Sequence, residues 1–108
     1  MSSMPDPPDT YKAFQQRYPK IGQAWELIGE AGREGPLDGK TVRLLKLAVA
    51  LGAMREGAVH ANVRKALAMG ISREEIEQVI AVAAGTLGLP SAVAVYSWVQ
   101  DDLSDRRS

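Results

Sequence analysis

The candidate for proton-transfer chemistry in this sequence is a stripe of three polar residues, Glu56, His60 and Arg64, spaced four apart. Residues four apart share one face of an α-helix, so the Glu56 carboxylate can orient the His60 imidazole. An imidazole with an ordinary pKa of about 6.5 suits general acid-base work. We therefore take His60 and Glu56 as the candidate catalytic pair. A solvated helix face is the alternative, and the sequence leaves both open.

The residue types exclude several other chemistries. Because there is no cysteine, the chain can form no disulfide, thiolate metal site or thiol redox centre. His60 is the single histidine, so with Glu56 it supplies at most half of a metal site, and we expect no metal and no cofactor. Ser91 and Ser97 have no histidine nearby in sequence, and Gly85–Gly88 lacks the lysine of a phosphate-binding loop.

Composition limits the architecture and the partners. The chain has 108 residues, 45% hydrophobic and 24% charged, which favours a single globular domain. Its 13 Lys and Arg balance its 13 Asp and Glu, so we expect no nucleic acid or membrane partner. The chain starts without the basic and apolar regions of a signal peptide, which favours a cytoplasmic location. A domain this small gains stability when subunits share a core, so we expect a homo-oligomer.

The two ends differ from the middle. Three prolines between positions 5 and 8 predict an extended or disordered lead-in over residues 1–9. Residues 105–108 have nothing to bury and predict a frayed tail. Between them, residues 10–104 predict an all-α domain of about six helices, because no strand pattern interrupts the helical periodicity.

The first three helices are predicted from their breaks and apolar positions. The first covers about 10–18, and Pro19 either ends it or begins the next helix at its first turn. The second is expected to turn three apolar side chains inward and to close at a run of glycines: Ile21, Trp25 and Ile28, then Gly29, Gly32 and Gly35–Pro36. Asp38 can cap a third, through about Met54, whose apolar face is Leu44, Leu45, Leu47, Ala48 and Leu51.

The later helices carry clearer signals. A fourth, about 56–69, ends at Gly70 and buries Val59, Val63, Ala66 and Leu67. Ser72–Glu75 is a capping box, with Ile71 and Ile76 at the staple positions of a fifth helix whose inward residues are Ile76, Val79, Ile80, Ala83 and Leu87. The sixth, to about Leu103, is apolar nearly all round, which predicts burial between subunits or against several neighbours.

An ordered set of motifs over residues 11–103 resembles the carboxymuconolactone decarboxylase-like family, which includes the AhpD-like alkylhydroperoxidases. The motifs are Tyr18–Pro19, Gly35–Pro36–Leu37–Asp38, Lys40–Thr41, Val63–Gly70, Ser72–Ile76 and Gly88–Leu89–Pro90. The resemblance implies an AhpD-like helical bundle around a central helical hairpin. It also implies assembly into dimers, trimers or hexamers.

The family's reactive residues are replaced in this chain. The resemblance places Arg55 and Ala58 where the hydroperoxidases have a Cys-x-x-Cys, Asn62 at the position of their histidine, and Arg43 at that of their glutamate. Peroxide reduction through a disulfide needs both sulfurs, so it is excluded. His60 precedes Asn62 by two residues, about 200° around a helix, and cannot simply replace that histidine.

With the family packing, Arg43 would face Asn62 from a neighbouring helix and bind a small carboxylate through charge-assisted hydrogen bonds. An ordinary surface arginine is the alternative. Two functions follow as hypotheses. One is a thiol-independent lyase or isomerase, decarboxylating or isomerising a lactone, with His60 and Glu56 as catalytic residues and Arg43 and Asn62 as substrate contacts. The other is a non-catalytic oligomeric module that retains the fold and binds a ligand or partner.

Overall fold

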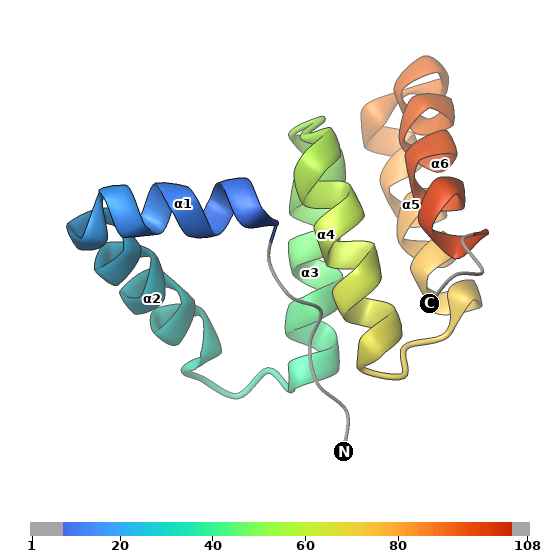
Figure 1. The fold of residues 1–108 in the computed structure, drawn as a ribbon. Helices are drawn as coiled ribbons and strands as arrows, with labels where there is room; N and C mark the ends of the chain where they lie inside the picture. Colours follow the sequence, from blue (N-terminus) through green and yellow to red (C-terminus); the bar gives the residue numbers. More distant parts are fainter. Residues whose placement is uncertain (1–7, 105–108) are drawn as a thin grey trace.

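The computed structural model describes residues 8–104, and all the regular structure within that range is helical (Figure 1). The predicted six-helix, all-α fold is confirmed. The helices are α1 (Asp9–Arg17), α2 (Pro19–Arg33), α3 (Gly39–Gly52), α4 (Glu56–Ala68), α5 (Arg73–Leu87) and α6 (Leu89–Leu103). Helix α1 begins one residue before the predicted start of the domain. Residues 1–7 of the predicted lead-in and the predicted tail, 105–108, lie outside the described residues.

Two antiparallel hairpins, α3–α4 and α5–α6, pack side by side and enclose the core (Figure 1). Each helix contributes the apolar stripe that its periodicity predicts. The buried residues of this core cluster are Leu47, Ala50, Leu51, Val59, Val63, Ala66, Ile71, Ile76, Ile80, Val95, Val99 and Leu103. Helix α4 lies between α3 and α6, so side chains on its two flanks meet different neighbours.

The start of α5 confirms the predicted capping box. The Ser72 hydroxyl accepts a hydrogen bond from the Glu75 amide at 3.1 Å, and the Glu75 carboxylate accepts one from the Ser72 amide at 2.9 Å. The staple residues Ile71 and Ile76 are both buried. Glu75 also forms an ion pair with Lys40, which ties the start of α5 to the first turn of α3.

The break before α2 and the loop after it have separate local causes. Tyr18 adopts a φ of −130°, as expected for a residue before proline, and Pro19 opens α2 without a backbone donor. The prediction that Gly29 and Gly32 end α2 is wrong, because a glycine inside a helix weakens it without stopping it. The loop follows at Gly35, whose φ of +124° requires glycine.

The α1–α2 arm, residues 9–33, has no buried residue. Its helix α2 packs against α1 and makes only a small contact with α3 (Figure 1). The prediction that Ile21, Trp25 and Ile28 face inward is therefore wrong for a single chain: they are 49%, 58% and 61% exposed. The periodicity predicts that a face is to be covered and does not say by which surface. Because α2 leads away from the two hairpins, no surface within residues 8–104 covers its apolar stripe.

Other apolar side chains on the two hairpins are also exposed. Leu45 and Leu67, predicted as inward, are exposed. Leu45 lies about 200° around the helix from buried Leu47, and Leu67 lies about 100° from buried Ala66. Helix α6 buries Ala92, Val95, Val99 and Leu103 against α4 and α5, whereas Val93 and Tyr96 are exposed. One face of α6 therefore packs against α4 and α5, and the face with Val93 and Tyr96 is left exposed by the described part of the chain.

Candidate functional site

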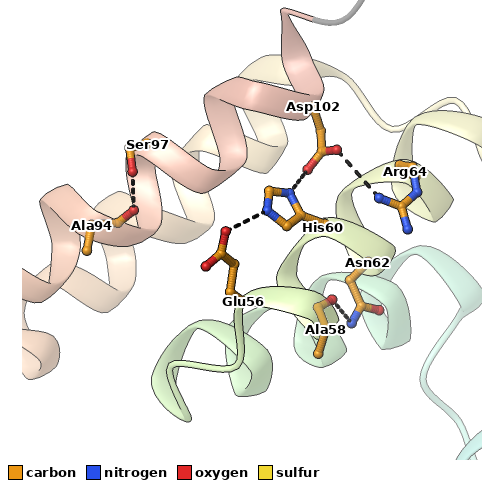
Figure 2. A network of polar contacts seen from close by, with 8 residues as sticks. All are labelled: Glu56, Ala58, His60, Asn62, Arg64, Ala94, Ser97 and Asp102. Atoms are coloured by element: carbon orange, nitrogen blue, oxygen red, sulfur yellow. Dashed lines mark hydrogen bonds and ion pairs between the residues drawn. The ribbon is translucent and has the colours of Figure 1, made fainter.

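His60 lies between two carboxylates on the flank of α4 that faces α6 (Figure 2). Its Nδ1 is 2.5 Å from Oδ2 of Asp102, and its Nε2 is 3.2 Å from Oε2 of Glu56. The His60 side chain is 22% exposed and that of Asp102 is 13% exposed, whereas Glu56 is 56% exposed. Within the stripe, His60 is therefore partly covered by α6, whereas Glu56 and Arg64 remain exposed.

Asp102 is the residue that the sequence analysis missed. It comes seven residues after Val95 and three after Val99, both fully buried, so the register of α6 directs it toward α4. That register was readable in the sequence as an acidic residue on an otherwise apolar stripe. Its partner was not readable, because 42 residues separate Asp102 from His60 and only the packing of α6 on α4 brings them together.

The electrostatics of this cluster favour a protonated His60. Partial burial lowers the pKa of the imidazole, but hydrogen bonds to Asp102 and Glu56 and the charges of both carboxylates outweigh it. The net effect raises the pKa of His60 above 6.5. Arg64 lies 3.6 Å from the other oxygen of Asp102, so the chain Glu56–His60–Asp102–Arg64 alternates in charge when His60 is protonated.

Arg43 and Asn62 form a second pair, on the flank of α4 that faces α3. The Arg43 Nη1 donates to Oδ1 of Asn62 at 2.7 Å, and the Asn62 side-chain amide donates to the Ala58 carbonyl at 2.9 Å (Figure 2 shows the latter bond). The Nε of Arg43 is buried without a hydrogen-bond partner. Burial also lowers the pKa of the Arg43 guanidinium. Arg43 is thus half-buried and fixed by an amide.

The side chains of His60 and Asn62 lie on different sides of α4, as the rotation between positions 60 and 62 predicts (Figure 2). An open hollow at the start of α4 is lined by residues 54–58. Glu56, the partner of His60, and Ala58, the partner of Asn62, both line it. Met54 in the same wall has a φ of +55°, a strained conformation for a residue with a side chain.

This arrangement can hold or release a proton at one imidazole and can attract an anion. Asp102 contacts the ring at Nδ1 and Glu56 contacts it at Nε2, and Glu56 is the more exposed of the two carboxylates. Glu56 and Asp102 lie at opposite edges of the imidazole ring. Within residues 8–104, no group of three or more His, Asp or Glu side chains is placed to hold a metal ion. In the same part of the chain, no helix has the length and apolar character needed to cross a bilayer.

Comparison with known proteins supports the resemblance seen in the sequence. No curated protein matches the chain. A crystal structure of a carboxymuconolactone decarboxylase family protein from Legionella pneumophila, in its apo form, has a similar fold, with a TM-score of 0.79 and 20% identity over 88% of this chain and 86% of that one. The profile of the carboxymuconolactone decarboxylase family matches residues 19–101. That match reaches from α2 into α6 and includes the Glu56–His60 and Arg43–Asn62 pairs. The chain therefore belongs to the carboxymuconolactone decarboxylase family.

Proposed function

We propose that this chain is a thiol-independent member of its family that transfers protons on a small carboxylate substrate, with His60 as the reacting group. The observation that supports this most directly is the 2.5 Å contact between Asp102 and the Nδ1 of His60. A carboxylate bonded to one ring nitrogen fixes the orientation of the imidazole and stabilises its charged form, leaving the other nitrogen for the reactant. Asp102 is therefore a positioning residue, and His60 is the catalytic residue.

Lactone decarboxylation is one reaction that suits a charged imidazole. The bond between the carboxylate and the ring carbon breaks, carbon dioxide leaves, and the electron pair moves into the conjugated lactone. The protonated His60 then donates its Nε2 proton to carbon and is reprotonated by solvent. In an isomerisation, neutral His60 would instead remove a proton from one carbon and return it to another. Both reactions balance without an oxidant, a reductant or sulfur.

The hollow formed by residues 54–58 is the proposed place of the reacting group, because Glu56 and Ala58 line it and contact His60 and Asn62 respectively. Arg43 and Asn62 are the proposed contacts for a substrate carboxylate. Arg43 has the unpartnered Nε, and Asn62 holds the guanidinium in place. Glu56 closes the site toward His60 in the unliganded chain and gives way to the substrate.

The test is turnover of a panel of carboxylated lactones by the wild type and by His60→Gln, followed by release of carbon dioxide and by absorbance of the conjugated product. Loss of a general acid is expected to lower kcat by about a hundredfold or more. Asp102→Asn should retain some activity and shift the pH profile to lower pH, because the pKa of His60 falls without the carboxylate. Equal turnover by wild type and His60→Gln would exclude His60 as the reacting group.

A non-catalytic, ligand-binding module is the second candidate function. It is favoured by the fact that both ring nitrogens of His60 already contact carboxylates, which is also what a purely structural clamp between α4 and α6 would show. The two functions differ in ligand response. A module would bind a carboxylate through Arg43 without turnover, and His60→Gln would leave that binding unchanged.

We also propose that the functional unit is a homo-oligomer, in the cytoplasm, in which the α1–α2 arm packs on a second copy. No residue of α1 or α2 is buried by the rest of residues 8–104, yet α2 carries the apolar stripe of Ile21, Trp25 and Ile28. Exposed apolar residues on α5 and α6 offer a complementary surface, among them Val82 and Val93. Light scattering coupled to gel filtration should give the mass of a single chain for Trp25→Glu and the mass of an oligomer for the control Gln23→Glu. A single-chain mass for the wild type would contradict this assembly.

A further inference from the structure

Three basic side chains share the flank of the α3–α4 hairpin that carries Asn62. Arg43 and Lys46 are three residues apart on α3, and Lys65 comes three residues after Asn62 on α4, so each pair lies on one helix face. The hydrogen bond from Arg43 to Asn62 shows that the two faces meet. We call Arg43, Lys46 and Lys65 the cationic face.

The cationic face has no negative partner among residues 8–104. The ion pairs within that range involve Lys40, His60 and Arg64, and none includes a member of the cationic face. The pKa values of Lys46 and Lys65 are lowered, first by partial burial and then by repulsion from Arg43 and other nearby cations. Arg43 and Lys65 are half-buried and Lys46 is exposed. Like charges that are partly removed from water repel one another more strongly than they would in bulk water, which is unfavourable when no anion is bound.

Arg43 also lacks an acceptor for one of its donors. Its Nη1 is bonded to Asn62, but Nε is buried and without a partner. A buried N–H group without an acceptor is destabilising, and an anion oxygen entering beside the guanidinium would supply that acceptor. The same ligand would neutralise the repulsion between the three cations.

We propose that the cationic face binds a phosphate dianion, either free or as a small phosphomonoester. A single carboxylate carries one negative charge and two acceptor oxygens, which is too little to neutralise and contact three cations. A phosphate group carries about −1.5 to −2 charges at neutral pH and three acceptor oxygens, enough to contact an arginine and two lysines together. The proposal rests on the proposed role of Arg43 as a ligand contact and is independent of proton transfer by His60.

The first experiment is calorimetric titration of the oligomeric wild-type protein with inorganic phosphate, with acetate at matched ionic strength as the comparison. We expect one phosphate per chain and much weaker binding of acetate. Lys46→Met and Lys65→Met should each weaken phosphate binding by about tenfold or more, because each removes a charge-assisted hydrogen bond. The matched control is Lys20→Met, on the exposed surface of α2, which should bind phosphate as the wild type does.

A folding measurement without phosphate guards against a trivial loss of structure. Lys46→Met and Lys65→Met relieve repulsion, so their thermal midpoints should equal or exceed that of the wild type, even though they bind phosphate less well. Unchanged phosphate affinity in both variants would overturn the proposal, as would equal weakening by Lys20→Met or no binding of phosphate in the millimolar range.

Two further measurements distinguish free phosphate from a phosphomonoester and test the phosphate site independently of the proposed function. Tighter binding of glycerol 3-phosphate than of inorganic phosphate would identify a phosphomonoester as the ligand, and equal affinity would identify free phosphate. His60→Gln should bind phosphate as the wild type does, because His60 lies on the opposite flank of α4. If that variant loses turnover while the wild type binds no phosphate, the proton-transfer function stands and the phosphate site fails.

Discussion

Replacing Asp102 with asparagine tests the central contact of the site, its 2.5 Å bond to Nδ1 of His60. Asparagine keeps the size of the side chain and an acceptor oxygen but removes the charge. Both partners are mostly covered, with 13% and 22% of their side chains exposed, so solvent screens the bond little. A charge-assisted hydrogen bond of this kind contributes about 2 kcal/mol net, and we expect Asp102→Asn to lower the free energy of unfolding by that amount when His60 is charged.

The loss should depend on pH in a defined direction. The folded-state pKa of His60 is raised above 6.5, so the stabilisation from its charged form is complete below pH 6.5 and declines as the pH rises through the folded-state value. Above that value the neutral ring still donates to Asp102, and the difference between variant and wild type should fall to about 1 kcal/mol.

The assay is urea unfolding followed by helical circular dichroism, from about pH 5 to about pH 8. A loss of about 2 kcal/mol also corresponds to roughly 10 °C in the thermal midpoint of a domain of this size. The matched control is Asp101→Asn, the adjacent, exposed carboxylate of α6. The reasoning is refuted if the two variants lose the same stability at every pH, or if the loss in Asp102→Asn fails to shrink as the pH rises.

Three further substitutions test the local readings of the fold by urea unfolding. Gly70→Ala should lower the free energy of unfolding by about 1 kcal/mol, because Gly70 has a φ of +84° and no atom lies within 4 Å of an added Cβ. The control Gly52→Ala, at an unstrained helical position, should lower it by nothing. Equal losses in the two variants would contradict a backbone origin. Ser72→Ala should cost about 1 kcal/mol through loss of the capping box, and an unchanged midpoint would show that the cap is dispensable. Val63→Ala should lower the free energy of unfolding by about 2 kcal/mol, because the side chain is fully buried. A loss near zero would show that Val63 does not contribute to the stability of the core.

Features that depend on residues within one or two helical turns were predictable from the sequence. The capping box of α5 needs only Ser72 and Glu75, and its confirmation follows from hydrogen bonds that close within four residues. The contact between Glu56 and His60 is of the same local kind. The six helices, the family and the absence of thiol chemistry were likewise readable from residue types and spacing.

Features that depend on packing were not predictable in this way. Periodicity placed Trp25 on an apolar stripe, but only the direction of α2 shows that the stripe is uncovered in a single chain. The sequence offered His60 with one carboxylate neighbour, and the packing of α6 on α4 added Asp102 from 42 residues away. Spacing along a helix says which side chains share a face. Which faces meet depends on how whole helices pack, and that is a property of the tertiary structure.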